Sequence, residues 1–164
     1  MGEGRIYYAE QGNNYYLRLV GDVRVTLCTA LKTYIDSIFD SETISSVVVD
    51  LTEATAADST TLGLLTKVAL HIQAESIKPV MIIQDQSLVK VIESMGLQDI
   101  FELVESLPDT PSELQQLLCT KASTDEARSQ VLDAHKALMS LNKDNMNTFS
   151  ELVKSLEREA DKSA

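Results

Sequence analysis

The sequence predicts an α/β domain with a mixed β-sheet and amphipathic helices, followed by a C-terminal two-helix extension. Three observations support this prediction. Short β-rich segments alternate with segments whose apolar residues recur at helical spacing, the pattern of strands covered by helices. The first two β-rich segments are separated only by a turn and should pair antiparallel, whereas the later ones are joined through helices and should run parallel. After residue 118 the strand pattern stops and two helical patterns follow.

The first β-rich segments, residues 6–8 and 15–20, flank a turn-forming Gly-Asn-Asn cluster at residues 12–14. This pattern predicts a β-hairpin in which Leu17 and Leu19 share one face. The next segment predicts a helix that Thr26 caps. Its apolar stripe consists of Leu27, Leu31, Tyr34, Ile35 and Ile38.

The middle of the chain predicts two further strands, each followed by a helix. Residues 47–49 are three valines, as in a strand buried on both faces, and this strand should end at Asp50. Residues 51–57 should lead into the next helix. Its apolar residues are Leu62, Leu65, Val68, Ala69 and Ile72. Residues 80–83, after Pro79, predict the second buried strand.

A third helix and a last strand complete the predicted domain. The apolar face of the helix consists of Leu88, Val91, Ile92 and Met95, and Gly96 is placed as its C-terminal stop. Residues 100–104 predict the last strand. Pro111 and Ser112 should open a short helix that runs through Leu118. The predicted order is therefore β-β-α-β-α-β-α-β-α, within a domain of residues 1–118.

Residues 119–124 are small and polar and predict a linker to the extension at residues 125–164. Ser123 and Glu126 form a capping-box signature before the first extension helix. The two helices carry apolar stripes: Val131, Leu132, Leu138 and Met139, and then Met146, Phe149, Leu152, Val153 and Leu156. Such a pair cannot form a core alone. We expect at least one helix to dock on the domain or exchange with a second copy; the alternative is a mobile tail that orders on a partner.

Composition narrows the classes of partner. The formal net charge of −11 opposes binding to nucleic acid and to anionic membranes. Only 5% of the residues are aromatic, which disfavours a base-stacking surface. The N-terminus lacks a signal-peptide pattern, and no apolar run has the length of a membrane span. Cys28 and Cys119 fit no metal or redox spacing. These features favour a cytoplasmic protein with protein partners.

Residues 47–52, followed by Asp58-Ser59-Thr60-Thr61-Leu62-Gly63, form the most informative stretch of the sequence. It resembles the phosphorylation loop of the STAS family of bacterial anti-sigma-factor antagonists, in which a strand leads to D-S-[ST]-G-L-G at a helix start. Further segments fit the resemblance: Gly21-Asp22-Val23, residues 80–83, and residues 90–97 followed by Ile100-Phe101. It covers roughly residues 5–118.

The resemblance implies a STAS-type fold and a non-enzymatic anti-sigma-factor antagonist that is switched by phosphorylation of Ser59. The unphosphorylated form would bind an anti-sigma factor; a serine kinase, often the anti-sigma factor itself, would end that interaction, and a PP2C-type phosphatase would restore it. The implied partner-binding residues are Gly21, Asp22, Asp58, Thr60, Thr61 and Leu62. Thr61 departs from the family, which usually has Gly there, and its β-branched side chain narrows the backbone options of the loop.

The residues themselves support two interpretations of this stretch. Residues 58–61 could simply cap the helix, because Asp, Ser and Thr are routine there. A hydroxyl at a helix N-terminus also meets free N–H groups, which tolerate a phosphoryl group. Neither His71 nor His135 has metal-ligand spacing, so a surface or structural role is expected for each. The sequence has no nucleophile elbow and no Gly-rich phosphate loop, so we expect no catalytic, cofactor or metal site.

Two other functions remain open for a domain that resembles the STAS family. One is an accessory subunit of a membrane transport system. The other is a partner-switch protein that binds a signalling enzyme such as a cyclase. The C-terminal helical pair, which is atypical of the minimal family domain, favours the latter of these two alternatives.

Overall fold

The computed structural model describes residues 4–24, 29–41, 43–118 and 121–163. Within these ranges one mixed sheet has the strand order β5-β4-β3-β2-β1-β6. The strands are β1 (Arg5–Gln11), β2 (Asn14–Val23), β3 (Ser46–Ala57), β4 (Val80–Ile82), β5 (Glu102–Val104) and β6 (Gln115–Gln116). The helices are α1 (Ala30–Phe39), α2 (Ser59–Gln73), α3 (Gln86–Ser94), the 3-10 turn η1 (Leu97–Asp99), α4 (Thr124–Met139) and α5 (Lys143–Ser163). The predicted fold class is confirmed.

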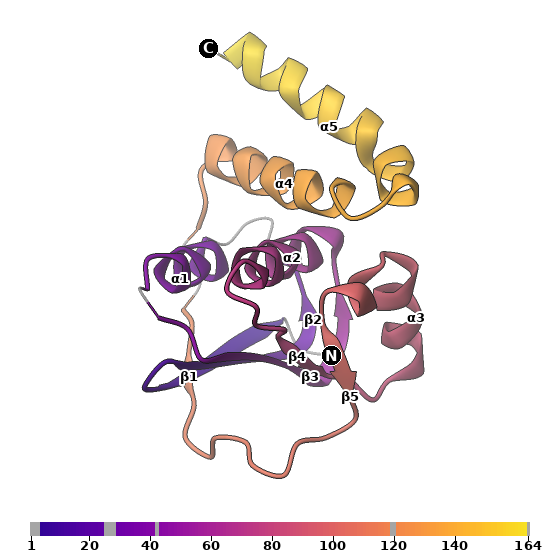
Figure 1. Ribbon diagram of the computed structural model, residues 1–164. Coiled ribbons are helices and arrows are strands. Elements are labelled where there is room, and N and C mark those ends of the chain that lie inside the picture. Colours follow the sequence, from indigo (N-terminus) through magenta and orange to yellow (C-terminus); the bar gives the residue numbers. More distant parts are fainter. Residues whose placement is uncertain (1–3, 25–28, 42, 119–120, 164) are drawn as a thin grey trace.

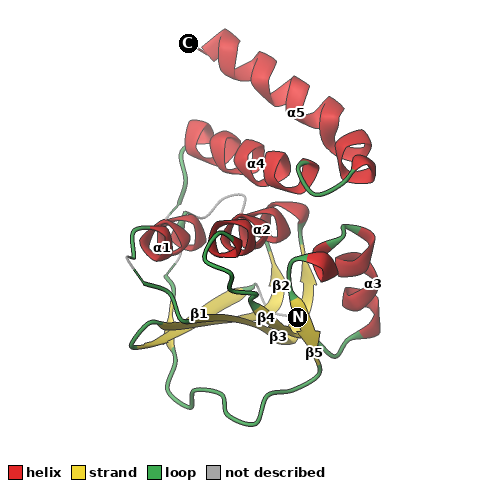
Figure 2. Ribbon diagram, viewed as in Figure 1, coloured by secondary structure: helices red, strands yellow, loops and turns green. Residues whose placement is uncertain are grey.

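The elements form successive layers. Helices α1 and α2 lie side by side over one face of the sheet, and α3 stands beside its β5 end (Figure 1). Helix α4 lies across the outer side of α2, and α5 covers α4 in turn (Figure 2). The loop between β5 and β6 passes across the opposite face of the sheet, where Leu107 and Pro111 lie near Tyr16 and Val48.

The predicted hairpin and parallel strands are present. β1 and β2 pair antiparallel around a turn in which Gly12 has φ of +63°, a conformation that favours glycine. Pairs β2–β3, β3–β4 and β4–β5 are parallel. Leu17 and Leu19 are fully buried, as their shared face predicts. Gly96 has φ of +82° and follows α3, as a C-terminal stop should.

The strand that begins at the valine run is longer than predicted. It does not end at Asp50 but continues to Ala57, so residues 51–57 form strand rather than a connection. The additional length pairs with the second half of β2, from Val20 to Val23, across two register irregularities. The sequence pattern missed this pairing because the segment is rich in small and polar residues rather than β-branched ones.

The helix predicted for Pro111 to Leu118 is wrong. Gln115 and Gln116 form β6, which pairs antiparallel with Tyr7 and Tyr8 at the outer edge of β1. The amide of Leu117 donates to the Ile6 carbonyl at 2.8 Å. The segment therefore forms hydrogen bonds with backbone groups at the edge of β1 that a short helix would leave unpaired.

The predicted helices agree with the structure in part. Helix α1 begins at Ala30 with Thr29 as N-cap, and the predicted cap Thr26 and first stripe residue Leu27 lie outside the described residues. In α3, Leu88 and Ile92 are buried but Val91 is exposed. The stripe of α2 is confirmed: Leu62, Leu65, Val68, Ala69 and Ile72 are all buried in the main core.

The extension consists of two helices, as predicted. The Ser123–Glu126 capping box starts α4, and the connection to α5 is residues 140–142, slightly earlier than the predicted break at 142–145. The side of α4 that is buried consists of Gln130, Ala134, His135 and Leu138. Among the apolar residues of α5, Val153 is buried, whereas Met146 and Leu152 are exposed. At least one extension helix is thus docked on the domain.

Candidate functional site

The Asp58–Ser59 pair lies at the junction between β3 and α2. Asp58 has an extended backbone and is the N-cap: its Oδ1 accepts from the Thr61 amide at 2.8 Å and from the Thr61 hydroxyl at 2.6 Å. Ser59 is therefore the first helical residue of α2. The N-terminal end of α2 carries the positive end of the helix dipole.

The predicted neighbours Gly21 and Asp22 come close to this junction. Asp22 pairs in register with Ala56, and Val23 pairs with Ala57, so the end of β2 lies alongside the residues that precede Asp58. The Asp58 amide donates to the Val23 carbonyl at 3.2 Å. Gly21 has φ of +78°, which a side chain would strain. The structure thus brings Gly21, Asp22, Asp58 and Ser59 to one end of the sheet.

The other predicted contact residues are not at the surface. Thr60, Thr61 and Leu62 are each no more than 3% exposed. Leu62 belongs to the main core, and the Thr61 hydroxyl also lies 3.4 Å from the Val23 carbonyl. The residue that departs from the family pattern, Thr61, therefore reinforces the Asp58 cap. In this structure the rest of the chain covers all three side chains.

Ser59 itself is in contact with the C-terminal extension. Its Oγ lies 2.8 Å from Nε2 of His135, a residue of α4 that is 2% exposed. The other ring nitrogen, Nδ1, lies 2.7 Å from the Val131 carbonyl oxygen. Because a carbonyl only accepts, Nδ1 carries a proton and donates to it. In the neutral ring Nε2 is then the acceptor, and the Ser59 hydroxyl donates to it.

Helices α2 and α4 approach closely one turn further along. A Cβ added to Gly63 would lie 2.6 Å from the Ala134 carbonyl carbon and still closer to its oxygen. One further turn along α2, Lys67 Nζ lies 3.9 Å from Asp133 Oδ2. Ser59, Gly63 and Lys67 follow the i, i+4, i+8 spacing of one helix face. We call these three residues the α2 outer stripe.

The role of His135 was missed at the level of sequence. A lone histidine without metal-ligand spacing gave no signal, and the apolar stripe of α4 was drawn through Val131 and Leu132, which are only partly buried. The available signal was Gln130, Ala134 and Leu138 at i, i+4 and i+8, together with a glycine inside α2. A glycine within a helix often marks close packing of a second backbone. The other histidine, His71, stacks on Phe39 with ring centroids 4.3 Å apart.

A second polar cluster lies on the opposite face of the sheet. Asp50, only 3% exposed, accepts hydrogen bonds from the Tyr16 hydroxyl and from Thr52, and Arg18 Nε lies 3.4 Å from its Oδ2. Burial alone raises the pKa of Asp50, but the bonds from Tyr16 and Thr52 and the nearby Arg18 outweigh it and hold that pKa below its usual value. Burial and the bond to Asp50 raise the pKa of Tyr16 to about 12.

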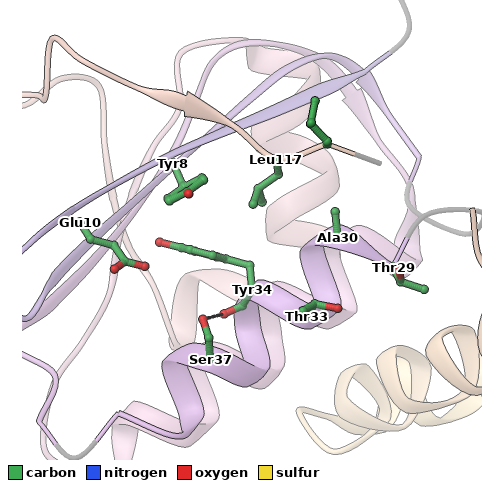
Figure 3. A pocket seen from close by; sticks show the side chains of 9 residues that line it. Tyr8, Glu10, Thr29, Ala30, Thr33, Tyr34, Ser37 and Leu117 are labelled. Carbon is green, nitrogen blue, oxygen red and sulfur yellow. Dashed lines mark hydrogen bonds between the residues drawn. The ribbon is translucent and has the colours of Figure 1, made fainter. Parts of the chain in front are cut away.

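A cavity of about 450 Å³ opens between β1 and α1 (Figure 3). The Tyr34 hydroxyl points toward Glu10, and the Tyr8 and Tyr34 rings lie 4.9 Å apart. Burial and the Glu10 carboxylate raise the pKa of Tyr34. None of the predicted site residues lines this cavity, so it is separate from the Ser59 region.

Across the described ranges, His, Cys, Asp and Glu side chains do not gather in a group of three or more that could hold a metal ion. None of the helices in this part of the chain combines the length and apolar character needed to cross a bilayer.

Comparison with known families identifies the domain. The profile described as the STAS domain matches residues 5–110, well over half of the chain. This match covers the sheet from β1 to β5 and the helices α1 to α3. The chain therefore belongs to the STAS family, with two C-terminal helices beyond the matched residues. A comparison with curated proteins finds no match.

Proposed function

We propose that this protein is an anti-sigma-factor antagonist that binds an anti-sigma factor when unphosphorylated and is switched off by phosphorylation of Ser59. The observation that carries the proposal is the position of Ser59. It is the first residue of α2, directly after the N-cap Asp58, in a domain of the STAS family. Gly21 and Asp22 lie at the same end of the sheet and extend the surface that a partner would contact.

The chemistry of this position supports a switch. A phosphoryl group adds about −1.5 to −2 charges, which the N-terminal dipole of α2 tolerates. The fold can therefore survive the modification. Asp58 lies directly beside Ser59, whereas the nearby Asp22 is paired with Arg24 at 3.2 Å. A partner built for a neutral hydroxyl next to Asp58 would meet a concentrated negative charge after phosphorylation. Leaving such a charge unpaired in an interface commonly costs several kcal/mol.

The proposal includes the enzymes that act on Ser59. A serine kinase, often the anti-sigma factor itself in this family, would add the phosphoryl group, and a PP2C-type phosphatase would remove it. The protein would act in the cytoplasm by binding and without catalysis of its own. The net charge of −11 supports a protein partner rather than nucleic acid.

Affinity capture with two variants tests the proposal. Ser59→Ala should capture the partner of the unphosphorylated state, and Ser59→Asp should capture it at least ten-fold more weakly, because about 1.4 kcal/mol changes affinity ten-fold. Ser112→Asp, on the exposed loop that precedes β6, is the matched control for the added charge. Equal capture of the same proteins by Ser59→Ala and Ser59→Asp would rule out the switch.

A further inference from the structure

We propose that α4 is a built-in cover over the α2 outer stripe, and that kinase and partner gain full access to the partly buried Ser59 when α4 lifts. The inference rests on the proposed function for the identity of those partners. The cover itself rests on the contacts of Ser59, Gly63 and Lys67 with α4. It extends the role of the C-terminal helices from packing to control of access.

The Ser59–His135 hydrogen bond competes with phosphoryl transfer from a kinase. In-line transfer requires the attacking hydroxyl to face the γ-phosphate of ATP. Here the Ser59 Oγ lies 2.8 Å from Nε2, and the rings of His135 and Phe149 form a T-shaped contact with centroids 4.9 Å apart. Ser59 as a whole is only partly buried, so what α4 withholds from a kinase is the hydroxyl that His135 engages. Movement of α4 away from α2 would release that hydroxyl for transfer.

The Gly63–Ala134 contact explains how α4 comes so close. With no side chain at position 63, the backbone of α4 rests directly on α2. Any larger residue at 63 would push α4 outward while leaving the core side of α2 unchanged, since the three atoms nearest to such a Cβ all belong to Ala134. The same contact shows what the stripe accepts: a helix with a small residue opposite Gly63 and a hydrogen-bond acceptor opposite Ser59.

Helix α5 holds the cover in place from outside. Arg128 lies 3.7 Å from Glu159 and Lys136 lies 3.8 Å from Glu157, so two ion pairs join α4 to the later part of α5. Asn145, at the start of α5, donates to the Met95 carbonyl at 2.8 Å and ties the pair to the end of α3. The cover is therefore a docked pair of helices anchored at more than one point.

Thiol labelling measures the opening on the isolated full-length chain. The parent carries Ser59→Cys with Cys28→Ala and Cys119→Ala, so that one thiol reports on the stripe. The probe is 5,5′-dithiobis(2-nitrobenzoate), and each rate is divided by the rate of the same variant in urea. We expect the folded parent to react at least 100-fold more slowly than the urea-unfolded chain. Hydrogen exchange of α4 should match that of the unsubstituted protein, which verifies that the cover survives the substitutions.

Adding Gly63→Ala should speed labelling at least ten-fold, because its Cβ displaces α4. Gln73→Ala, at an exposed position of the same helix, should leave the labelling rate unchanged.

The ion pair between Lys67 and Asp133 gives a second test. Asp133→Lys places two like charges together at Lys67 and should raise the labelling rate a few-fold. The swap Lys67→Asp/Asp133→Lys should restore the original rate. Circular dichroism should show full helix content in each variant. The charge pair tests the cover even if Gly63→Ala does not fold.

Three results would overturn the proposal: labelling of the folded parent at the unfolded rate, labelling that Gly63→Ala and Asp133→Lys leave unchanged, or labelling that slows as protein concentration rises. The last result would assign the cover to α4 of a second copy. None of these results decides whether Ser59→Ala and Ser59→Asp capture different partners. Failure of the cover and failure of the switch are therefore distinguishable.

Discussion

The hydroxyl of Ser59 begins a chain of hydrogen bonds that passes through the imidazole of His135 to the carbonyl of Val131. The chain fixes the tautomer of the ring, because the Val131 carbonyl can only accept. The residue proposed for modification is thus also a structural link between α2 and α4. A phosphoryl group at Ser59 would remove the hydrogen that Nε2 accepts in the neutral ring.

This link should be measurable as an energetic coupling. In a double-mutant cycle with Ser59→Ala and His135→Phe, we expect a coupling of about 1 kcal/mol in the free energy of unfolding, the usual net value of a hydrogen bond. Phe keeps the aromatic contact with Phe149, so the cycle isolates the polar interaction. Urea denaturation of the four proteins measures it. Strictly additive effects would mean that the bond contributes nothing to stability.

Asp50 should give the protein a sensitivity to acid. Its folded pKa lies below the ordinary value of 3.8, so the charged form stabilises the fold above that value. The stability is lost as the pH falls from the ordinary pKa through the folded one. Asp50→Asn should lower the free energy of unfolding at pH 7 by about 2 kcal/mol, since it weakens hydrogen bonds to a charged group. It should also reduce the loss of stability that occurs as the pH falls below about 4.

Urea denaturation at a series of pH values checks this expectation. Glu53→Gln is the matched control, because Glu53 lies 3.6 Å from Arg18 but has a largely exposed side chain. This substitution should leave the loss of stability at acid pH almost unchanged, because exposed ion pairs contribute little. If Asp50→Asn and the unsubstituted protein lost the same stability at acid pH, Asp50 would not be the source of the acid sensitivity.

Among the helices, α2 depends on its first turn. Asp58→Ala removes the acceptor for both the Thr61 amide and the Thr61 hydroxyl, and should cost about 1 kcal/mol in the free energy of unfolding. Asp58→Asn keeps an acceptor there and should cost only about a few tenths of that amount. Thermal denaturation measures both. Equal losses in the two variants would show that the charge of Asp58, rather than its capping bond, holds the turn.

The two extension helices should differ in how much each residue contributes. Val153 is 5% exposed and Leu152 is 41% exposed, although they are neighbours on α5. Val153→Ala should lower the free energy of unfolding by about 1–2 kcal/mol, whereas Leu152→Ala should change it by no more than about 0.5 kcal/mol. Denaturant titration compares them. A larger loss for Leu152→Ala would mean that α5 turns a different face toward α4.

Elements with strong periodicity could be predicted from the sequence. Examples are the valine run, the apolar stripe of α2 and the hairpin around Gly12. In each, only one type of secondary structure can bury the apolar residues together. Elements that depend on a distant partner could not. Residues 51–57 become strand only because β2 continues beside them, and β6 forms because β1 has a free edge. The Leu and Gln residues near 115 suit a helix equally well when taken alone.

The residues of the candidate site also differ in whether local sequence patterns predict them. Asp58 and Ser59 could be found from the motif, and their position at the start of α2 agrees with it. The burial of Thr61 and Leu62 follows from the helix periodicity, which turns them toward the interior. His135 comes from a segment 76 residues away, and its contact depends on tertiary packing. Local sequence patterns carry no information on such a pairing.

As a whole molecule, the protein consists of a STAS domain and a docked pair of helices. The pair contacts the domain along α2. The family-matched residues end at 110, before both α4 and α5. The pair therefore lies outside the part of the chain that defines the family, yet it contacts the residue on which the proposed switch depends. If the cover must lift before a partner binds, the apparent affinity falls by the fraction of molecules that are open.

The phosphorylation state of Ser59 tests the central claim most directly. The protein is purified from the cells that naturally produce it, with and without treatment by a PP2C-type phosphatase, and its phosphorylated residues are mapped by mass spectrometry. We predict a single phosphate on Ser59 that the phosphatase removes. Phosphate on Thr60 or Thr61 with Ser59 unmodified would contradict the claim.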